Sequence, residues 1–256
     1  MQGKTLFVSG GTRGIGKAIV YAFAEKGCNV AFTYASSADT ANEIIADIEA
    51  KFGVKSRAYK LNILEPETYK DVYKLFDEDF DRLDYFISNA IISGRAVVGG
   101  FGPFMRLKPK GLNNIWTATV DAFVVGSQEA AKRMEKTGGG SIISMSSTGN
   151  LVYTPNYAGH GTNKAAVETM VKYAAAELGS MGIRVNAVSG GPIDTDALKA
   201  FPNYEEVKAE VAKRSPLNRM GESEDLTGAC LFLCDKGASW LTGQTIIVDG
   251  GTTFTS

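Results

Sequence analysis

The chain has 256 residues and a formal net charge of −1, with 44% hydrophobic and 21% charged residues. This balanced charge disfavours a nucleic-acid-binding or membrane-surface protein, and no apolar run is long enough to span a membrane. The length suits one α/β domain with a substantial core.

The ends and the cysteines indicate where the protein resides. The first predicted strand begins near residue 4, which leaves no room for a signal peptide. Three cysteines, Cys28, Cys230 and Cys234, make a poor disulfide framework. Cys230 and Cys234 lie four apart in an apolar helical pattern, where small core residues are a simpler interpretation than metal ligands. We therefore expect a cytoplasmic protein without a metal site.

Short apolar runs alternate with helical patterns along the whole chain. The runs predict strands at residues 6–8, 29–34, 56–61, 83–87, 141–146, 183–188 and 244–248. Helices are predicted from residue 15 and over 41–52, 66–80, 113–136, 156–178, 204–212 and 225–234. Continuous apolar strands with helical crossovers predict an α/β fold, a single doubly wound parallel sheet with helices on both faces. No linker or repeat interrupts residues 1–256, so we expect one domain.

A glycine-rich turn at residues 9–16 joins the first strand to the first helix. Gly10, Gly14 and Gly16 allow a tight turn and let the backbone approach a ligand closely. The helix that follows offers unpaired N–H donors and the positive end of its dipole. The turn therefore predicts a phosphate-bearing ligand, and the alternative is a turn that binds nothing.

Several polar or glycine residues follow the predicted strands directly. The turn at Gly10, then Asn89, Ser146 and Gly190, each come after a strand end. Ligands of doubly wound sheets bind outside the carboxyl ends of the strands. We therefore expect these residues to converge on one crevice.

Tyr157 and Lys164 lie seven residues apart on one predicted helix, which places them on the same face. Ser146 and Ser147 close the preceding strand. A lysine charge would stabilise a phenolate and lower the tyrosine pKa from about 10, giving an acid for neutral pH. From spacing alone, an interfacial tyrosine and a solvated lysine are the simpler interpretation.

Taken together, these motifs resemble those of the short-chain dehydrogenase/reductase family. The segments that carry the resemblance are residues 9–16, 88–90, Tyr157 with Lys164, 184–188 and 247–251. They occur in the family's order and cover nearly the whole chain. The resemblance implies a Rossmann fold that binds NAD(H) or NADP(H) and transfers hydride to or from carbonyls or activated double bonds.

The spacing between tyrosine and lysine bears on the subfamily. Most members have Tyr-x-x-x-Lys, which would place the tyrosine where this chain has His160. Enoyl-(acyl-carrier-protein) reductases instead have tyrosine, six residues and lysine, as Tyr157 and Lys164 do. Residues 186–199 and 244–251 also resemble the NADPH-dependent enoyl reductases of the Bacillus type. This implies reduction of an enoyl thioester in fatty-acid synthesis. The alternatives are a carbonyl reductase acting on a 3-oxoacyl thioester, a sugar or a polyol, and a non-catalytic dinucleotide-sensing protein.

The resemblance also implies site residues. The catalytic residues would be Tyr157, Lys164 and Ser147, with Tyr157 bonding the thioester oxygen and Lys164 holding the ribose hydroxyls. The cofactor-binding residues would be Gly10, Thr12, Arg13, Gly14, Ile15, Gly16, Ser36, Asn62, Ile63, Asn89, Ala90, Lys164, Gly191, Pro192, Ile193 and Thr195. Residues 193–220 would form a mobile flap over the acyl chain, in which Leu198, Phe201 and Leu217 suit an apolar chain or the core.

The second strand bears on the choice of cofactor. NAD-specific sites place an acid after this strand to bind the ribose 2′-hydroxyl. Here residues 34–37 contain no acid, and the first is Asp39. Arg13 supplies a cation for a 2′-phosphate, although no second cation follows the strand at 35–38. NADPH is therefore favoured over NADH.

Three features depart from the family pattern. Asp121 stands at the best match to a catalytic asparagine, which puts a proton-relay role there in doubt. His160 is the only histidine, and a supporting or core role suits it better than general acid catalysis. Residues 91–112 form a glycine-rich stretch that Bacillus-type enzymes lack in this form. Because the stretch is long for a connection inside a compact domain, it is functional or mobile. Its Arg95, Arg106, Lys108 and Lys110 either contact an acidic acyl-carrier protein or its phosphopantetheine, or are solvated. The resemblance also implies a homotetramer built partly from the helices at 113–136 and 156–178.

Overall fold

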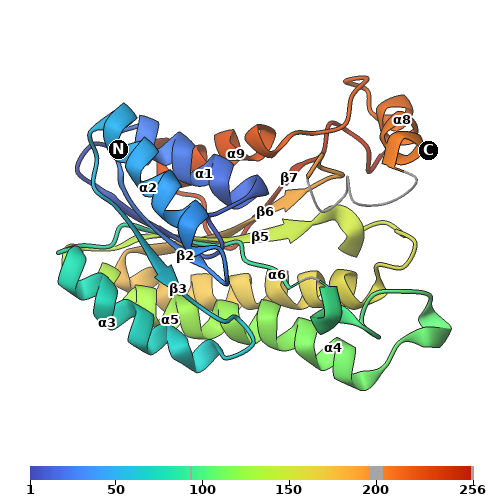
Figure 1. Cartoon of the computed structure of the whole chain (residues 1–256), viewed down its shortest axis with the longest axis horizontal. Helices are drawn as coiled ribbons and strands as arrows, with labels where there is room; N and C mark the ends of the chain where they lie inside the picture. Colours follow the sequence, from blue (N-terminus) through green and yellow to red (C-terminus); the bar gives the residue numbers. More distant parts are fainter. Residues whose placement is uncertain (93, 196–203, 255–256) are drawn as a thin grey trace.

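The computed structural model describes residues 1–92, 94–195 and 204–254, and these contain one seven-stranded parallel sheet (Figure 1). The strands are β1 (Thr5–Val8), β2 (Asn29–Tyr34), β3 (Ser56–Lys60), β4 (Tyr85–Ser88), β5 (Gly140–Ser147), β6 (Ile183–Gly190) and β7 (Thr245–Val248). Their order is β3-β2-β1-β4-β5-β6-β7, so the winding direction reverses between β1 and β4. The predicted α/β fold is confirmed, and the seven predicted strands all occur.

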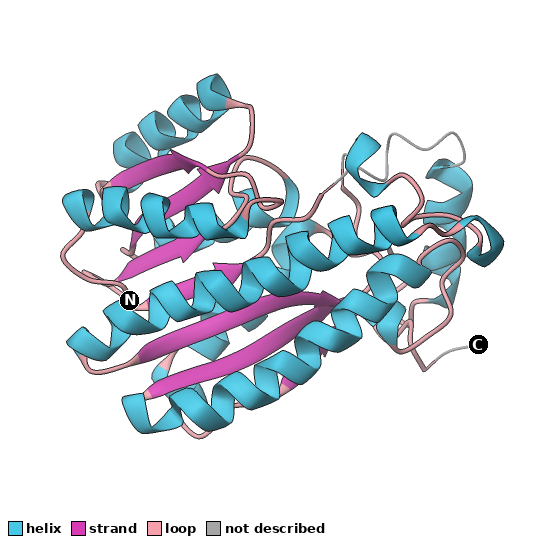
Figure 2. Ribbon diagram, turned by 90° about the horizontal axis from the view of Figure 1, so that it is seen from below, coloured by secondary structure: helices cyan, strands magenta, loops and turns pink. Residues whose placement is uncertain are grey.

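Helices cover both faces of the sheet. They are α1 (Gly14–Glu25), α2 (Ala38–Phe52), α3 (Tyr69–Asp79), α4 (Pro109–Trp116), α5 (Ala122–Met134), α6 (Ala158–Leu178), α8 (Tyr204–Arg214) and α9 (Thr227–Cys234). Helices α1, α2 and α9 lie on one face, and α3, α5 and α6 lie on the other (Figures 1 and 2). Neighbouring β1 residues belong to different cores: Phe7 joins the α3 side, whereas Leu6 and Val8 join the α1 side. Burial on both faces explains why the strands are apolar at consecutive positions.

The helix predicted over 113–136 begins earlier and is interrupted. Pro109 starts α4, because its fixed φ and missing N–H suit a first helical position. A π-helical turn, Thr117–Asp121, then separates α4 from α5. The sequence pattern predicts a loop at Pro109, and the structure corrects this prediction by four residues.

The 91–112 stretch is docked on the N-terminal end of α6. Two short 3-10 turns, Gly94–Val97 and Phe104–Arg106, lie within it. The Gly102 amide donates to the Asn156 carbonyl at 3.0 Å. A Cβ on Gly159 would lie 2.0 Å from the Gly100 carbonyl oxygen, so glycine is needed for this approach.

Part of the predicted 193–220 flap is described. Asp194 accepts hydrogen bonds from the Tyr204 hydroxyl at 2.8 Å and the Lys208 ammonium at 3.1 Å, which ties α8 to the end of β6. Ile193 forms a bridge with Gly221. The predicted acyl-chain residues Leu198 and Phe201 lie outside the described residues, and Leu217 is exposed.

Candidate active site

The glycine turn after β1 is held in place by β2. The Gly10 amide donates to Thr33 Oγ1 at 3.0 Å, and the Gly11 amide donates to the Thr33 carbonyl at 2.9 Å. Gly10 has φ +74°, and a Cβ on Gly16 would lie 1.9 Å from the Gly10 carbonyl oxygen. Both positions therefore require glycine, one for its conformation and one for a close approach.

The start of α1 suits an anionic group. Arg13 is the N-cap residue, but its side chain makes no capping hydrogen bond, and the first turn contains no acidic residue. The first amides of a helix need acceptors and carry partial positive charge. The turn and this helix end together fit the pyrophosphate of a dinucleotide.

Asn89 supports the glycine turn from β4. Its side-chain amide donates to the Ser9 carbonyl at 3.0 Å and to the Gly10 carbonyl at 2.9 Å. Ser9 Oγ accepts hydrogen bonds from the backbone amides of Asn89 and Ala90, each at 3.0 Å. Ser9 was not among the predicted site residues, because its partners come from a strand eighty residues away in the chain.

The other predicted cofactor residues follow further strands along the same edge. Ser36 is exposed after β2, and Asn62 and Ile63 follow β3. Asn62 donates to Glu65 at 2.9 Å, and Ile63 packs on the core below α3. Residues 191–195 follow β6, and the Thr195 methyl lies 3.9 Å from where a Cβ on Gly14 would be. The structure thus brings the loop after β6 against the glycine turn.

Three rings meet at the N-terminal end of α6. Tyr157 is the N-cap residue of the helix, and its ring stacks on His160 with centroids 5.3 Å apart. Phe101, from the 91–112 stretch, meets both rings edge-on at 6.5 and 6.0 Å. Burial and the Lys164 charge lower the pKa of His160 to about 4, so its imidazole is neutral at physiological pH. The spacing to Lys164 in the sequence indicates Tyr157 and His160, but only the fold brings in Phe101.

Lys164 lies behind these rings, almost wholly buried. Its ammonium donates to the Met145 carbonyl at 2.6 Å. Burial lowers the pKa of Lys164 to about 8, although the Glu168 charge opposes this shift. Ser147 is the last residue of β5, at the carboxyl end of the strand. Its side chain forms a hydrogen bond with the Tyr157 phenol.

The expected effect of Lys164 on Tyr157 is wrong for this structure. Burial raises the pKa of Tyr157 above its ordinary value, and the Ser147 hydrogen bond offsets only part of the shift. Tyr157 precedes the first helical residue instead of lying on the helix, with φ −100° and ψ 3°. The Lys164 ammonium donates its hydrogen bond to the Met145 carbonyl, and the pKa of Tyr157 is set by burial and the Ser147 hydroxyl.

Asp121 is turned to another partner. Its carboxylate accepts a hydrogen bond from Trp116 Nε1 at 3.0 Å, in an exposed position on the π-helical turn. One carboxylate oxygen of Asp121 is therefore engaged by Trp116, and the doubt about a relay role for Asp121 stays a prediction.

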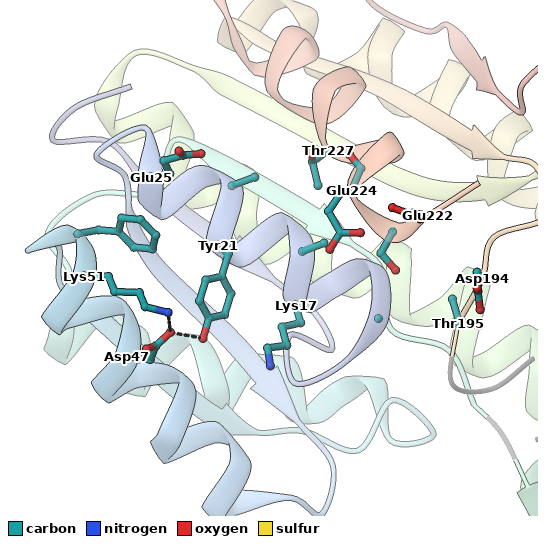
Figure 3. Close-up of a pocket in the computed structure, with 15 residues that line it drawn as sticks. Lys17, Tyr21, Glu25, Asp47, Lys51, Asp194, Thr195, Glu222, Glu224 and Thr227 are labelled. Carbon is teal, nitrogen blue, oxygen red and sulfur yellow. Dashed lines mark hydrogen bonds and ion pairs between the residues drawn. The ribbon is translucent and has the colours of Figure 1, made fainter. Parts of the chain in front are cut away.

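A groove of about 950 Å³ runs along the outer side of α1 (Figure 3). Tyr21, Asp47 and Lys51 form a hydrogen-bonded group on one wall, and Glu222 and Glu224 lie on the other. Of the predicted cofactor residues, Gly14 and Thr195 line it. The groove therefore adjoins the start of α1 and the loop after β6, and the Tyr157 cluster does not line it. Among the described residues, no helix could cross a membrane and no group of acidic, histidine or cysteine side chains could hold a metal ion.

Comparisons with known proteins agree with this arrangement. Residues 10–253 match the family model described as Enoyl-(Acyl carrier protein) reductase. The chain is 37% identical over 249 residues to 1-cyclohexenylcarbonyl-CoA reductase of Streptomyces collinus, covering 95% of this chain and 85% of that protein. It is 34% identical to the 3-oxoacyl-(acyl-carrier-protein) reductase of Staphylococcus aureus, covering 97% of each.

Solved structures give the same picture. A short-chain type dehydrogenase/reductase from Mycobacterium ulcerans superposes with a TM-score of 0.89 at 28% identity, covering 100% of this chain and 91% of that one. A variant of a Serratia marcescens short-chain dehydrogenase/reductase superposes with a TM-score of 0.88 at 32% identity, covering 98% of each chain.

Proposed function

Since the chain belongs to the short-chain dehydrogenase/reductase family, we propose that it is an NADPH-dependent reductase that delivers hydride to the β-carbon of an acyl thioester. The observation that carries the proposal is that Tyr157 is hydrogen-bonded to Ser147 at the carboxyl end of β5, while buried Lys164 binds Met145 two residues earlier in the same strand. Two relatives are named as reductases of acyl thioesters, one on coenzyme A and one on acyl-carrier protein.

Each side chain has a role in this proposal. A bound nicotinamide would supply the hydride. Tyr157 would donate its hydroxyl hydrogen to the substrate oxygen on which negative charge develops. Ser147 would keep the phenol oriented, and Lys164 would hold the ribose. The raised pKa of Tyr157 keeps the phenol protonated, as a hydrogen-bond donor must be.

The position of Tyr157 favours an enoyl thioester as the substrate. When hydride adds to the β-carbon of a conjugated double bond, negative charge develops on the thioester oxygen, away from the carbon attacked. When it adds to a 3-oxo group, the charge develops on the attacked carbon's own oxygen. Tyr157 lies one turn before His160, the place of the usual tyrosine, so its hydroxyl would approach a substrate from a different point. The name 1-cyclohexenylcarbonyl-CoA likewise describes a double bond conjugated with a thioester.

A 3-oxoacyl thioester is the second candidate, and the relatives' names favour it. The 3-oxoacyl reductases of Staphylococcus aureus match this chain over nearly their whole length, and a second staphylococcal species provides further relatives of that name. By names alone, reduction of a carbonyl is better supported than reduction of a double bond.

NADPH is the proposed cofactor on the basis of Arg13 and the loop after β2. Arg13 is exposed at the N-cap of α1, and Ser36 is exposed on the neighbouring loop. The guanidinium could pair with a 2′-phosphate, and no carboxylate stands at the end of β2 to repel it.

Parallel assays test the proposal. Crotonyl and acetoacetyl thioesters would each be offered with NADPH and with NADH, and loss of the reduced cofactor would be followed. Turnover of the crotonyl thioester would support reduction of a double bond as the activity. Turnover of the acetoacetyl thioester alone would support reduction of a carbonyl group. If neither thioester is reduced with either cofactor, the proposal is wrong.

Replacing the proposed acid gives a residue-level prediction. Tyr157→Phe should lower kcat about 100-fold or more, because the developing oxyanion loses its donor, while cofactor affinity stays within about 2-fold. Tyr153→Phe is the matched control, because Tyr153 lies on the same segment and is 90% exposed. Equal activity of Tyr157→Phe and the wild type would remove Tyr157 from the mechanism.

A further inference from the structure

Lys164 is a buried cation whose ammonium directly contacts no carboxylate among the described residues. Its residue is 7% exposed, and its one hydrogen bond among the described residues goes to a neutral carbonyl, that of Met145. An ammonium removed from water loses its hydration, and a single carbonyl dipole replaces little of it. A buried lysine in such surroundings tends to release its proton. A lysine that must hold ribose hydroxyls by donating hydrogen bonds needs to retain that proton.

Glu168 lies one helical turn further along the same face of α6. Its Oε1 accepts a hydrogen bond from Ser146 Oγ at 2.5 Å. Ser146 directly follows Met145 in β5. The Met145 carbonyl binds the Lys164 ammonium, and the Ser146 hydroxyl binds the Glu168 carboxylate, so two adjacent residues of one strand hold the two charged groups. We propose that Glu168, oriented by Ser146, is the positioning residue that keeps Lys164 in its ammonium form.

No other charged group takes this role among the described residues. The elements packed on α6 include β5, β6, α4, α5, the π-helical turn, the short turns Thr148–Asn150 and Gly179–Met181, and the 91–112 stretch. Their charged residues are Arg95, Arg106, Lys108, Lys110, Asp121, Glu129, Lys132, Arg133 and Arg184, and the cations among them cannot favour an ammonium. Arg184 binds backbone carbonyls, Asp121 binds Trp116, and the α5 charges pair among themselves or with Asp77. His160 is neutral above about pH 4. The charge of Glu168 alone raises the pKa of Lys164.

The inference rests on the proposed function only for the role of Lys164, which is to hold the ribose. Its test measures the protonation of Lys164 and does not depend on enzyme turnover. The side-chain carbons of lysine would be isotopically labelled, and the Lys164 resonance followed by NMR through a pH titration of the cofactor-free protein. The wild type should titrate near the expected pKa of about 8. Glu168→Gln should titrate lower by about 1 pKa unit.

Two further variants control the experiment. Glu168→Asp keeps the carboxylate and should restore most of the wild-type midpoint. Glu177→Gln removes an exposed carboxylate from the same helix and should leave the midpoint unchanged. A Glu168→Gln midpoint equal to that of the wild type would overturn the inference, whatever the assays show.

An activity profile provides the second measurement. If Lys164 must be charged, activity falls as pH rises through its pKa, and in Glu168→Gln this fall should begin about 1 pH unit lower. A protein that reduces no thioester but shows the shifted titration would contradict the proposed function and leave the inference supported.

Discussion

At the residue scale, His160 distinguishes this site from the Tyr-x-x-x-Lys pattern. Its imidazole lies against Tyr157 on one side and against Phe101 on another, and it is kept neutral by burial and by Lys164. A neutral ring can fix the phenol by contact without adding a second cation near the lysine. A supporting role for His160 therefore stays our prediction, and its contacts with Tyr157 and Phe101 are consistent with it.

This neutrality predicts a pH-dependent stability. The unfolded imidazole binds a proton below about pH 6.5, whereas the folded one does so only near pH 4. The contribution of His160 to stability is therefore complete above pH 6.5 and is lost as the pH falls toward 4. When the pH is lowered from 7 to 5, the free energy of unfolding should fall by about 1–2 kcal/mol more in the wild type than in His160→Phe. Urea unfolding at both pH values measures this difference.

Because the chain has a single histidine, the difference between the two proteins isolates this group. The carboxylates titrate in the wild type and in His160→Phe alike, so their effect on stability cancels when the two proteins are compared. Parallel loss of stability in the two proteins would show that His160 has an ordinary pKa.

At the element scale, Asp84 joins the beginnings of β1 and β4. Its carboxylate accepts hydrogen bonds from the Thr5 amide at 2.9 Å and Arg82 Nε at 2.7 Å, and it pairs with Lys4 at 2.9 Å. Burial alone would raise the pKa of Asp84, but hydrogen bonds from its three partners outweigh burial and hold the pKa below its usual value.

Removing this charge should weaken the pairing of the two central strands. Asp84→Asn should destabilise the protein by about 2 kcal/mol at pH 7, the typical contribution of a hydrogen bond to a charged group. Asp81→Asn, at an exposed position three residues earlier, should change stability by less than about 0.5 kcal/mol. Because the pKa of Asp84 is lowered in the folded protein, the difference in stability between Asp84→Asn and the wild type should be complete at pH values above the pKa of an ordinary aspartate. It should vanish in acid, where the folded Asp84 is also protonated. Chemical denaturation at pH 7 and in acid measures both variants. Equal stability of Asp84→Asn and Asp81→Asn at pH 7 would show that the Asp84 carboxylate does not stabilise the pairing of β1 and β4.

Patterns of single elements were the most predictable part of the fold. Apolar runs located all seven strands, because a sheet covered on both faces leaves little room for polar residues. The boundary at Pro109 was missed, because a proline can end a loop or begin a helix. Contacts such as Ser9 with Asn89, or Phe101 with Tyr157, join distant segments and have no local pattern.

At the scale of the whole molecule, positive charge gathers beside the proposed active site. Arg106, Lys108 and Lys110 are exposed on the docked 91–112 stretch, and no ion pair involves them among the described residues. No acidic residue occurs within 91–112. The stretch touches Tyr157 through Phe101, so an acidic carrier could dock here while its acyl arm reaches the crevice.

This arrangement predicts a dependence on the carrier. The double variant Arg106→Glu with Lys108→Glu should raise KM about 10-fold for a thioester on acyl-carrier protein, and leave KM for the coenzyme A thioester within about 2-fold. The control is Lys136→Glu, exposed at the C-terminal end of α5. Equal KM changes for the two thioesters would show that these cations do not recognise the carrier.

The hydrogen bonds around the glycine turn bear on how quickly a nucleotide can bind. Thr33, Asn89 and Ser9 hold Gly10 and its neighbours from two different strands. The conformational entropy of this loop is therefore lost when the sheet forms, and little remains to be lost on ligand association. We therefore expect nucleotide association to need little reordering of this loop, and side chains remote from the ligand to contribute to its order.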